Sequence, residues 1–169
     1  SASLALFFRE RLTAALAAAE RPTTADAYPD PSWLTEYQVE FDDSHVARWR
    51  PYVYWRRAPY QGRYINVDTS GIRRTVSLDP AVPGSRPPLR IFMFGGSNMW
   101  GTGARDALTI PSVVHRELHR QGLAAEVSNF GESGYVSTQE VISLLLQLRN
   151  GNRPDLVIFY DGVNDLFSA

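Results

Sequence analysis

The sequence contains neither cysteine nor lysine. Without cysteine, disulfide bonds, thiolate zinc sites and cysteine nucleophiles are excluded. All 17 basic residues are arginine, which excludes Schiff-base chemistry on lysine and the phosphate-binding lysine of a Walker loop. The formal net charge is −1, so we expect no bulk electrostatic attraction to nucleic acid. These absences remove several kinds of covalent and nucleotide chemistry before any motif is considered.

A long hydrophobic run is also missing. The longest early apolar run, Leu4 to Phe8, is interrupted at Arg9 and is far shorter than the roughly 20 residues of a membrane span. A positive start followed by an apolar core, as in a secretory signal, is not seen. The chain begins at Ser1 without a methionine, which leaves room for a removed signal or anchor. The compartment stays undecided, with an extracytoplasmic or membrane-associated location favoured over a cytoplasmic one.

Residues 1–80 are predicted to be an appendage of helices followed by irregular β structure. Apolar spacing and abundant alanine predict a helix over residues 3–20, and a linker follows over 21–28. A second helix is expected from Asp30-Pro31-Ser32, because aspartate caps helices and proline suits their first turn. It carries aromatic residues at four-residue steps, for which core packing is favoured over a ligand role: Trp33, Tyr37 and Phe41.

The segment from Arg48 to Arg74 contains seven arginines, many aromatic residues and one acidic residue, Asp68. It is either a surface for an anionic ligand or a solvated face with stacked guanidinium–aromatic pairs, and we favour the second interpretation. After it, residues 81–88 contain three prolines and are predicted to be the linker to the main domain.

The main domain, residues 89–169, alternates strands with helices. Strands are predicted over 89–94, 125–130 and 156–160, and helices over 109–121 and 137–149. This alternation predicts βαβ units and a parallel sheet. In the second helix we expect the apolar residues to face inward: Val141, Leu144, Leu145 and Leu148.

Three loops follow the predicted strands directly, at 95–98, 129–134 and 161–165. We call them the first, second and third strand-end loops. In an open parallel sheet, ligands bind beyond the carboxyl ends of the strands, so we expect the three loops to converge on one crevice.

The loops carry what acyl transfer requires. Ser97 is placed to present a nucleophilic hydroxyl, and backbone N–H groups of Ser97 and Gly134 with the side-chain amide of Asn164 can surround a developing oxyanion. Each residue also has a simpler interpretation. Ser97 and Gly134 are common turn residues, and Asn164 can cap a helix.

The main domain resembles the SGNH hydrolase family, also called GDSL esterases and lipases. Ile91 to Ser97 resembles its first block, in the GGS variant found in many bacterial members, and Asn129 to Gly134 resembles its second. Gly162-Val163-Asn164-Asp165 matches the GxND motif of its third block. The resemblance implies that Ser97 is the nucleophile and that Ser97, Gly134 and Asn164 form the oxyanion hole. Two earlier stretches look like the leader of some bacterial members: residues 64–68 and 71–73.

The sequence departs from the family in two places. Gly96 replaces the aspartate of the GDS form, which is tolerable because that aspartate is not the nucleophile. The DxxH block, which supplies the general-base histidine, is missing, so the histidine is expected beyond residue 169 and this chain alone is expected to be inactive. No residue of this chain is assigned as catalytic histidine or its aspartate.

The three histidines present are not expected to replace that base. His45 lies in the appendage, and His115 and His119 lie one turn apart on a helix that leaves the crevice. Such a pair can bind zinc, but no third ligand is evident, and a solvent-facing pair is the favoured interpretation. We therefore predict no metal and no cofactor.

The predicted fold class is α/β, with a three-layer, flavodoxin-like parallel sheet that is truncated. In the order 2-1-3-4-5, this chain supplies the first three strands, and the third would have a naked apolar edge. We expect a C-terminal fragment or a second chain to complete the sheet.

Two functions remain open. The first is a serine ester hydrolase acting through an acyl-enzyme at Ser97 on a small acyl ester, carried by a carbohydrate or a lipid, with acyl transfer equally compatible. The alternative is a pseudoenzyme or binding module that uses the crevice or the surface of residues 48–74. A nucleotide-binding domain is disfavoured because the loop 96–103 fits neither a dinucleotide nor a Walker motif.

Overall fold

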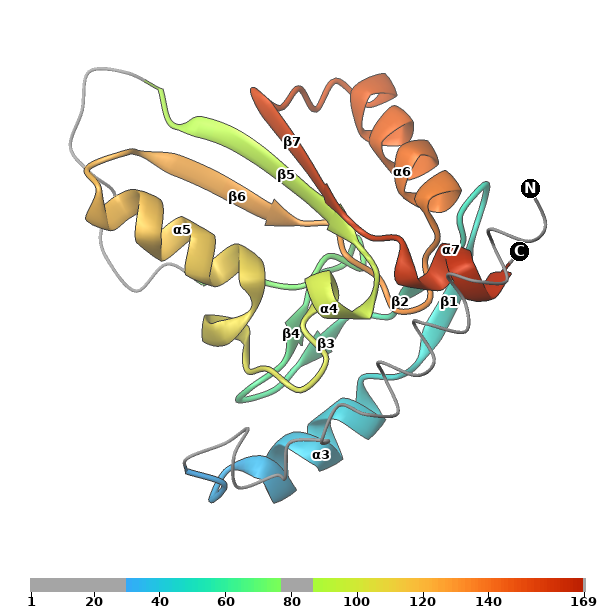
Figure 1. Ribbon diagram of the computed structural model, residues 1–169. Helices are drawn as coiled ribbons and strands as arrows, with labels where there is room; N and C mark the ends of the chain where they lie inside the picture. The colour runs from blue at the N-terminus through green and yellow to red at the C-terminus, as the bar shows by residue number, and fades with distance from the viewer. Residues whose placement is uncertain (1–29, 77–86, 169) are drawn as a thin grey trace, which may run out of the picture. The chain divides into compact units, whose positions relative to one another are not determined.

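The computed structural model describes residues 30–76 and 87–168 of the chain (Figure 1). The chain divides into two compact units after Thr35, and the fold described here is that of the second unit. The helix expected over 3–20, the linker over 21–28 and most of the proline-rich stretch 81–88 lie outside the described residues.

A three-stranded parallel sheet forms the centre of the second unit. Its strands are β5 (Leu89–Gly95), β6 (Ala125–Asn129) and β7 (Leu156–Tyr160), and their order is β6-β5-β7. Helix α5 (Ile110–Arg120) connects β5 to β6, and helix α6 (Ser137–Arg149) connects β6 to β7. The predicted parallel sheet of βαβ units is therefore confirmed, and its order is the 2-1-3 with which a flavodoxin-like sheet begins.

The two helices cover opposite faces of the sheet, so the core has three layers (Figure 1). Alternate side chains of β5 point to opposite faces, as the period of a strand requires. Ile91 and Met93 contact the side chains of α5 that point inward, Val114 and Leu118. Phe92 and Phe94 belong to a second cluster with residues on the α6 side, Phe130 and Leu144. The central strand is thus buried on both faces, as in other parallel sheets.

Helix α5 begins and ends as its sequence predicts. Thr109 is the N-cap, and its side chain accepts a hydrogen bond of 3.4 Å from the backbone N–H of Ser112. Pro111 lies in the first turn, where the missing N–H costs nothing. Gly122 follows the helix with φ of +78°.

Helix α6 has the predicted bounds, but the prediction of its inward face was wrong. Of the four apolar residues, only Leu144 joins the core, whereas Val141, Leu145 and Leu148 are exposed. The buried residues are polar instead: Gln139, Glu140 and Ser143.

The physical reason is a β-hairpin that lies against the polar side of α6. It consists of β1 (Ala47–Arg50) and β2 (Tyr54–Arg57), paired antiparallel. Gln139 donates a 3.0 Å hydrogen bond to the carbonyl of Val53, and Arg56 donates one of 3.3 Å to Ser143 Oγ. The polar side chains of α6 are therefore the ones that meet the rest of the chain.

The remaining N-terminal elements are short, in line with the predicted irregular β structure. Helix α3 (Leu34–Asp43) begins four residues after Asp30, and β3 (Tyr60–Gln61) pairs with β4 (Asn66–Val67). In α3, Tyr37 is buried and stacks on Phe41, so packing is confirmed for these two aromatic residues. The helix also supplies Glu40, whose carboxylate accepts backbone hydrogen bonds from residues 63–65.

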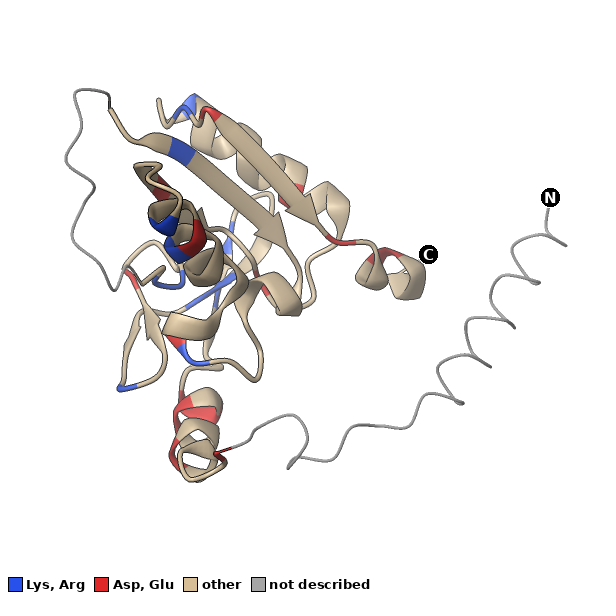
Figure 2. Cartoon of the chain, turned by 60° about the vertical axis from the view of Figure 1, so that its left-hand side comes forward, with Lys and Arg blue, Asp and Glu red and all other residues tan. Residues whose placement is uncertain are grey.

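The two edges of the sheet differ. Beside β6, Arg73 forms single antiparallel bridges to Asn129 and to Val67, so residues of the N-terminal half continue the sheet on that side. Strand β7 pairs only with β5 within the described chain. Its exposed apolar residues are Leu156 (45%), Phe159 (41%) and Tyr160 (56%). Figure 2 shows that β7 carries no charged residue between the aspartates that flank it.

Candidate functional site

The three strand-end loops contact one another, as the sequence predicts. Asn164 Nδ2 donates a 2.7 Å hydrogen bond to the carbonyl of Tyr135, the residue after Gly134. The same Nδ2 atom lies only 2.6 Å from the position that a Cβ on Gly96 would take. The amide of the third loop is therefore packed directly on the turn that leads to Ser97, and any side chain at Gly96 would displace it.

Ser97 is the first residue of a short helix, α4 (Ser97–Trp100), where the sequence predicts the first strand-end loop. Hydrogen bonds from Trp100 N–H to Gly96 O (3.0 Å) and from Gly101 N–H to Ser97 O (2.9 Å) hold this turn. Ser97 is half-buried, and its hydroxyl makes no hydrogen bond to the described residues. The hydroxyl is thus presented on an ordered turn, and no base within the described part of the chain accepts its proton.

Gly134 is exposed and has φ of +78°, a backbone conformation that favours glycine. Trp55 of the hairpin lies beside it, with its Cζ2 atom 3.5 Å from where a Cβ on Gly134 would be. The indole Nε1 of Trp55 donates a 3.2 Å hydrogen bond to Ser133 O. The role of Gly134 as an oxyanion donor stays a prediction, but its conformation and its neighbour are defined.

Asn164 is the second residue of helix α7 (Val163–Ser168), a helix that the sequence analysis did not assign. Its side chain is bonded to Tyr135 and does not serve as the helix cap, which was its simpler interpretation. The next residue, Asp165, accepts hydrogen bonds from the Ser137 backbone N–H (3.1 Å) and hydroxyl (2.7 Å). A carboxylate at the N-terminus of α6 is electrostatically favourable, and it ties the loop of Asn164 to α6.

A buried carboxyl group lies behind this loop and was missed by the sequence analysis. Glu140, in the first turn of α6, is fully buried, and its oxygens have no hydrogen-bond partner among the described residues. Burial, followed by the neighbouring carboxylates of Asp161 and Asp165, raises the pKa of Glu140 from 4.5 to about 8. The raised pKa favours the protonated, neutral form of this side chain next to the third strand-end loop.

Three arginines of the 48–74 segment are buried, which corrects the prediction of a solvated face. Arg56 donates to the carbonyls of Phe130 (3.0 Å) and Gly131 (3.3 Å) in the second strand-end loop. Arg57 is fully enclosed and pairs with Glu132 of the same loop. Its backbone N–H also donates a 2.9 Å hydrogen bond to that carboxylate, and burial lowers the pKa of its guanidinium.

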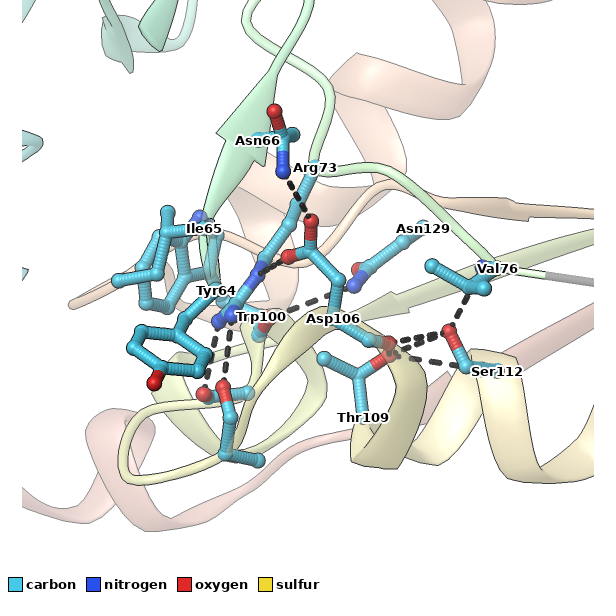
Figure 3. Close-up of polar contacts among 12 residues, drawn as sticks. Tyr64, Ile65, Asn66, Arg73, Val76, Trp100, Asp106, Thr109, Ser112 and Asn129 are labelled. Carbon is cyan, nitrogen blue, oxygen red and sulfur yellow. Dashed lines mark hydrogen bonds and ion pairs between the residues drawn. The ribbon is translucent and has the colours of Figure 1, made fainter. Parts of the chain in front are cut away.

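Arg73 makes the most extensive of these contacts (Figure 3). Its Nε donates to Asp106 (2.9 Å), and its other nitrogens donate to the carbonyls of Gly101 (2.7 Å) and Ala104 (2.6 Å). Burial raises the pKa of Asp106, and the charge of Arg73 opposes that shift. The residues after α4 are thus held by donors from the N-terminal half of the chain.

The predicted guanidinium–aromatic stacking is confirmed, although in the interior. The guanidinium groups of Arg57 and Arg73 both lie over the ring of Trp100, at 4.0 and 4.2 Å from its centroid. Trp100 ends the helix that Ser97 begins. The N-terminal half of the chain therefore supports the turn of the candidate nucleophile directly.

The histidines form no part of this arrangement. His45 lies edge-on against the ring of Phe41. His115 and His119 are half-buried on α5, less exposed than the solvent-facing pair that was expected. Within residues 30–76 and 87–168, no group of three or more histidine, aspartate and glutamate side chains is placed to hold a metal ion. No helix in this part of the chain has the length and apolar character to cross a membrane.

Comparison with solved structures finds SGNH-hydrolase family esterases as structural neighbours. The crystal structure of AlinE4, an SGNH-hydrolase family esterase, is 26% identical over 50% of this chain and 46% of that chain, with a TM-score of 0.46. Two mutants of the same esterase match with identities of 26% and 24% over the same shares. The match thus spans less than half of that esterase's length. No protein-family model and no curated protein matches the chain.

Proposed function

We propose that this chain carries the nucleophile and the oxyanion hole of a serine ester hydrolase of the SGNH/GDSL type, in the bacterial GGS variant. Ser97 attacks the acyl carbonyl, and the N–H groups of Ser97, Gly134 and the Asn164 amide stabilise the tetrahedral intermediate. One observation carries the proposal. The Asn164 amide lies against the Gly96 backbone, one residue before Ser97, and is bonded to the residue after Gly134.

The proposed reaction needs a general base that takes the proton of the Ser97 hydroxyl. Because that hydroxyl has no partner among the described residues, we propose that a histidine beyond residue 169 provides the base. The tetrahedral intermediate then expels the alcohol of the ester, which takes the proton from that base, and the acyl group left on Ser97 passes to water, or to a second hydroxyl in a transferase. The proposed substrate is a small acyl ester carried by a carbohydrate or a lipid.

Fluorophosphonate labelling tests the nucleophile, with added imidazole as a substitute base. We expect slow or no labelling of the chain in buffer, and labelling at Ser97 whose rate rises with imidazole concentration. Peptide mapping by mass spectrometry gives the labelled residue. The Asn164→Ala variant should be labelled about 10² to 10³ times more slowly, because one oxyanion donor is lost.

Two serine variants complete this experiment. Ser97→Ala should abolish labelling, whereas Ser133→Ala should retain it, although Ser133 is also a half-buried serine of the strand-end loops. Equal labelling of the Ser97→Ala variant, or no labelling of the folded wild-type chain at high imidazole, would rule out Ser97 as an activatable nucleophile.

A second candidate function is a non-catalytic binding module, and one cleft favours it. The hairpin turn and the C-terminal half of α6 line a cleft of about 630 Å³. Three arginines line it and no acidic residue does: Arg50, Arg56 and Arg149. This cleft suits an anionic ligand. Binding of such a ligand with no imidazole-dependent labelling of Ser97 would favour the binding module.

We also propose that strand β7 pairs with a further strand, from a C-terminal fragment or a second chain. The support is the exposed apolar edge described above, since unpaired apolar edges promote association.

A further inference from the structure

Among the buried arginines of the described chain, Arg56 differs from the other two in its counter-charge. Arg57 pairs with Glu132, and Arg73 pairs with Asp106. Arg56 is only 6% exposed, yet it has no carboxylate partner among the described residues. Charged side chains are almost never fully buried in proteins unless they are paired. The fold therefore leaves one buried guanidinium without a counter-charge.

The contacts of Arg56 within the chain are all to neutral groups. Its guanidinium donates to the carbonyls of Phe130 (3.0 Å) and Gly131 (3.3 Å) and to Ser143 Oγ (3.3 Å). It also lies 5.4 Å from the centroid of the Tyr135 ring, which is a weak substitute for a negative charge. A guanidinium carries more N–H donors than these three bonds use. Arg56 thus keeps donors for a ligand, and it lines the cleft described above.

This cleft, which we call the arginine cleft, receives positive charge from both of its walls. Arg50 and Arg56 project from the same face of the hairpin, because Arg56 pairs with Arg48 and residues two apart along a strand share a face. Arg149, in the last turn of α6, lines the opposite wall. No acidic residue of the described chain lines the cleft. An anion in this cleft therefore meets three positive charges and none of like sign.

The end of α6 presents donors to the cleft more than free carbonyls. Unpaired carbonyls at the C-terminus of a helix disfavour an anion. Here the carbonyls of Leu146, Gln147 and Leu148 accept hydrogen bonds from the backbone N–H groups of residues 150–152. Hydroxyl and amide side chains complete the polar lining: Thr69, Ser70, Ser143, Gln147, Asn150 and Asn152.

We propose that the arginine cleft binds a small phosphate monoester, which supplies the missing counter-charge of Arg56. The inference rests on the cleft of the second candidate function, names its ligand class, and does not require Ser97 to be a nucleophile. A phosphate monoester carries a charge of about −1.5 to −2 at pH 7 and three acceptor oxygens, so it accepts from guanidinium groups on both walls. A carboxylate has one charge and two oxygens, which a single guanidinium satisfies.

The size of the cleft favours an esterified phosphate over the free ion. Its volume of about 630 Å³ is in the range of sites for small organic ligands. Apolar and aromatic side chains lie beside the arginines, among them Tyr52 and Leu146. The body of the ester can therefore contact these side chains while its phosphate binds the guanidinium groups.

Isothermal titration calorimetry with phenyl phosphate as the probe tests the site. We expect the wild-type chain to bind phenyl phosphate about tenfold more tightly than phenyl sulfate, which has the same shape but a single negative charge. Arg149→Gln should weaken binding of phenyl phosphate about tenfold or more, because one charge-assisted contact is lost. Arg153→Gln removes an exposed arginine that does not line the cleft, so this matched control should bind like wild type.

Arg149 is exposed, so its substitution should leave the fold unchanged, which circular dichroism and urea unfolding verify. Equal binding by wild type and the Arg149→Gln variant would overturn the site, and so would no binding of phenyl phosphate by wild type. Equal affinity for phenyl sulfate would reject a phosphate monoester as the ligand class. Loss of binding in Ser97→Ala would place the probe at the strand-end loops and would also contradict the proposal.

Vesicles distinguish the two sources of a phosphate monoester. Binding to phosphatidic acid in phosphatidylcholine vesicles that is lost in Arg149→Gln, together with binding of phenyl phosphate, supports the proposal with a lipid headgroup as the source. Binding of phenyl phosphate alone supports it with a soluble ligand. Labelling of Ser97 judges the proposed esterase separately, because the calorimetry does not depend on that hydroxyl.

Discussion

The two edges of the central sheet are built from strands of equal length and are completed in opposite ways. At β6, Arg73 bridges to Asn129, and its guanidinium is enclosed among Asp106 and backbone carbonyls. At β7, a row of apolar side chains is exposed. One edge is thus closed by polar contacts with a distant part of the same chain. The β7 edge is not paired with another strand among the described residues and exposes apolar side chains, as an edge that can pair with a further strand does.

The difference teaches where the stability of this fold lies. The β6 edge depends on the buried ion pair of Arg73 and Asp106. Loss of Arg73 would leave a buried carboxylate without its counter-charge and several buried carbonyls without a donor. Strand β7 pairs with β5 alone among the described strands, and Val157 and Ile158 pack into the two core clusters, whereas its exposed side chains contribute little within the described chain. Substitutions at the two edges should therefore differ strongly in their effect on the free energy of unfolding.

The largest effect is expected at the closed edge. Arg73→Met keeps an unbranched apolar stem but removes the guanidinium, which leaves buried Asp106 without its ion-pair partner. It should lower the free energy of unfolding by about 3–5 kcal/mol, the cost typical of breaking a buried ion pair. Urea denaturation measures the loss. Arg74→Met changes an exposed neighbour and should cost less than about 0.5 kcal/mol. A loss below about 1 kcal/mol in Arg73→Met would contradict the role of this edge.

The next effect is expected behind the third strand-end loop, where Glu140 is buried with a pKa of about 8. Below about pH 4.5 this carboxyl is protonated in both the folded and the unfolded chain. Between about pH 4.5 and 8 the unfolded chain loses the proton while the folded protein keeps it, so stability falls as pH rises. Above about pH 8 the folded protein also loses the proton, and the free energy of unfolding stays lower by the full cost of ionising the buried carboxyl.

The Glu140→Gln variant removes this titration. It should be more stable than wild type by about 4–5 kcal/mol at pH 8.5 and nearly equal to it at pH 4. Urea unfolding across this pH range measures the difference. Glu126→Gln, which changes an exposed carboxylate on β6, should follow the wild-type curve. A constant offset between Glu140→Gln and wild type at all pH values would show that folding does not shift the pKa of Glu140.

The smallest effect on folding is expected at the exposed apolar residues of α6. Leu145→Lys, in the exposed stripe of α6, should change the free energy of unfolding by less than about 0.5 kcal/mol. It should nevertheless reduce concentration-dependent association, measured by sedimentation velocity, because it interrupts an exposed apolar surface. Leu123→Lys alters a similarly exposed leucine just after α5 and serves as the control. Equal association of the Leu145→Lys and Leu123→Lys variants would show that the exposed stripe of α6 is not a preferred surface for association.

Much of the fold follows from local sequence patterns. The strands and the two long helices have the predicted order, and the three strand-end loops meet as the topology of a parallel sheet requires. Ser97, Gly134 and Asn164 were located in those loops because the carboxyl ends of parallel strands share one edge. Helical and strand periodicity are local properties, and they are readable without knowledge of the partner.

The orientation of α6 was not predictable in this way. Its polar residues are buried because a hairpin far earlier in the chain lies against them, and Gln139 and Val53 are 86 residues apart. Local periodicity indicates that one face of a helix is apolar, but it does not indicate which face meets a distant segment. The buried carboxyl of Glu140 was missed because its charged neighbours, Asp161 and Asp165, lie in the third strand-end loop, which local periodicity does not place against α6.

The burial of the arginines escaped prediction for a different reason. Each strand-end loop leaves backbone carbonyls without a ladder partner, and these must be satisfied inside the protein. Arg56 supplies donors to carbonyls of the second strand-end loop, Arg73 supplies them to carbonyls of the residues after α4, and Arg57 pairs with Glu132. A sequence read segment by segment shows a basic stretch and a set of loops. It does not show that the arginines of the stretch donate hydrogen bonds to the backbone carbonyls of those loops.

The contacts of Trp100 with Arg57 and Arg73 have a consequence for the order of folding events. The bonds from the hairpin to the second strand-end loop span 75 and 78 residues, so large loops must close before they form. Contacts of such sequence separation slow folding and form after local helices. The turn that presents Ser97 therefore reaches its final packing late, when the first and the last thirds of the described chain have already met.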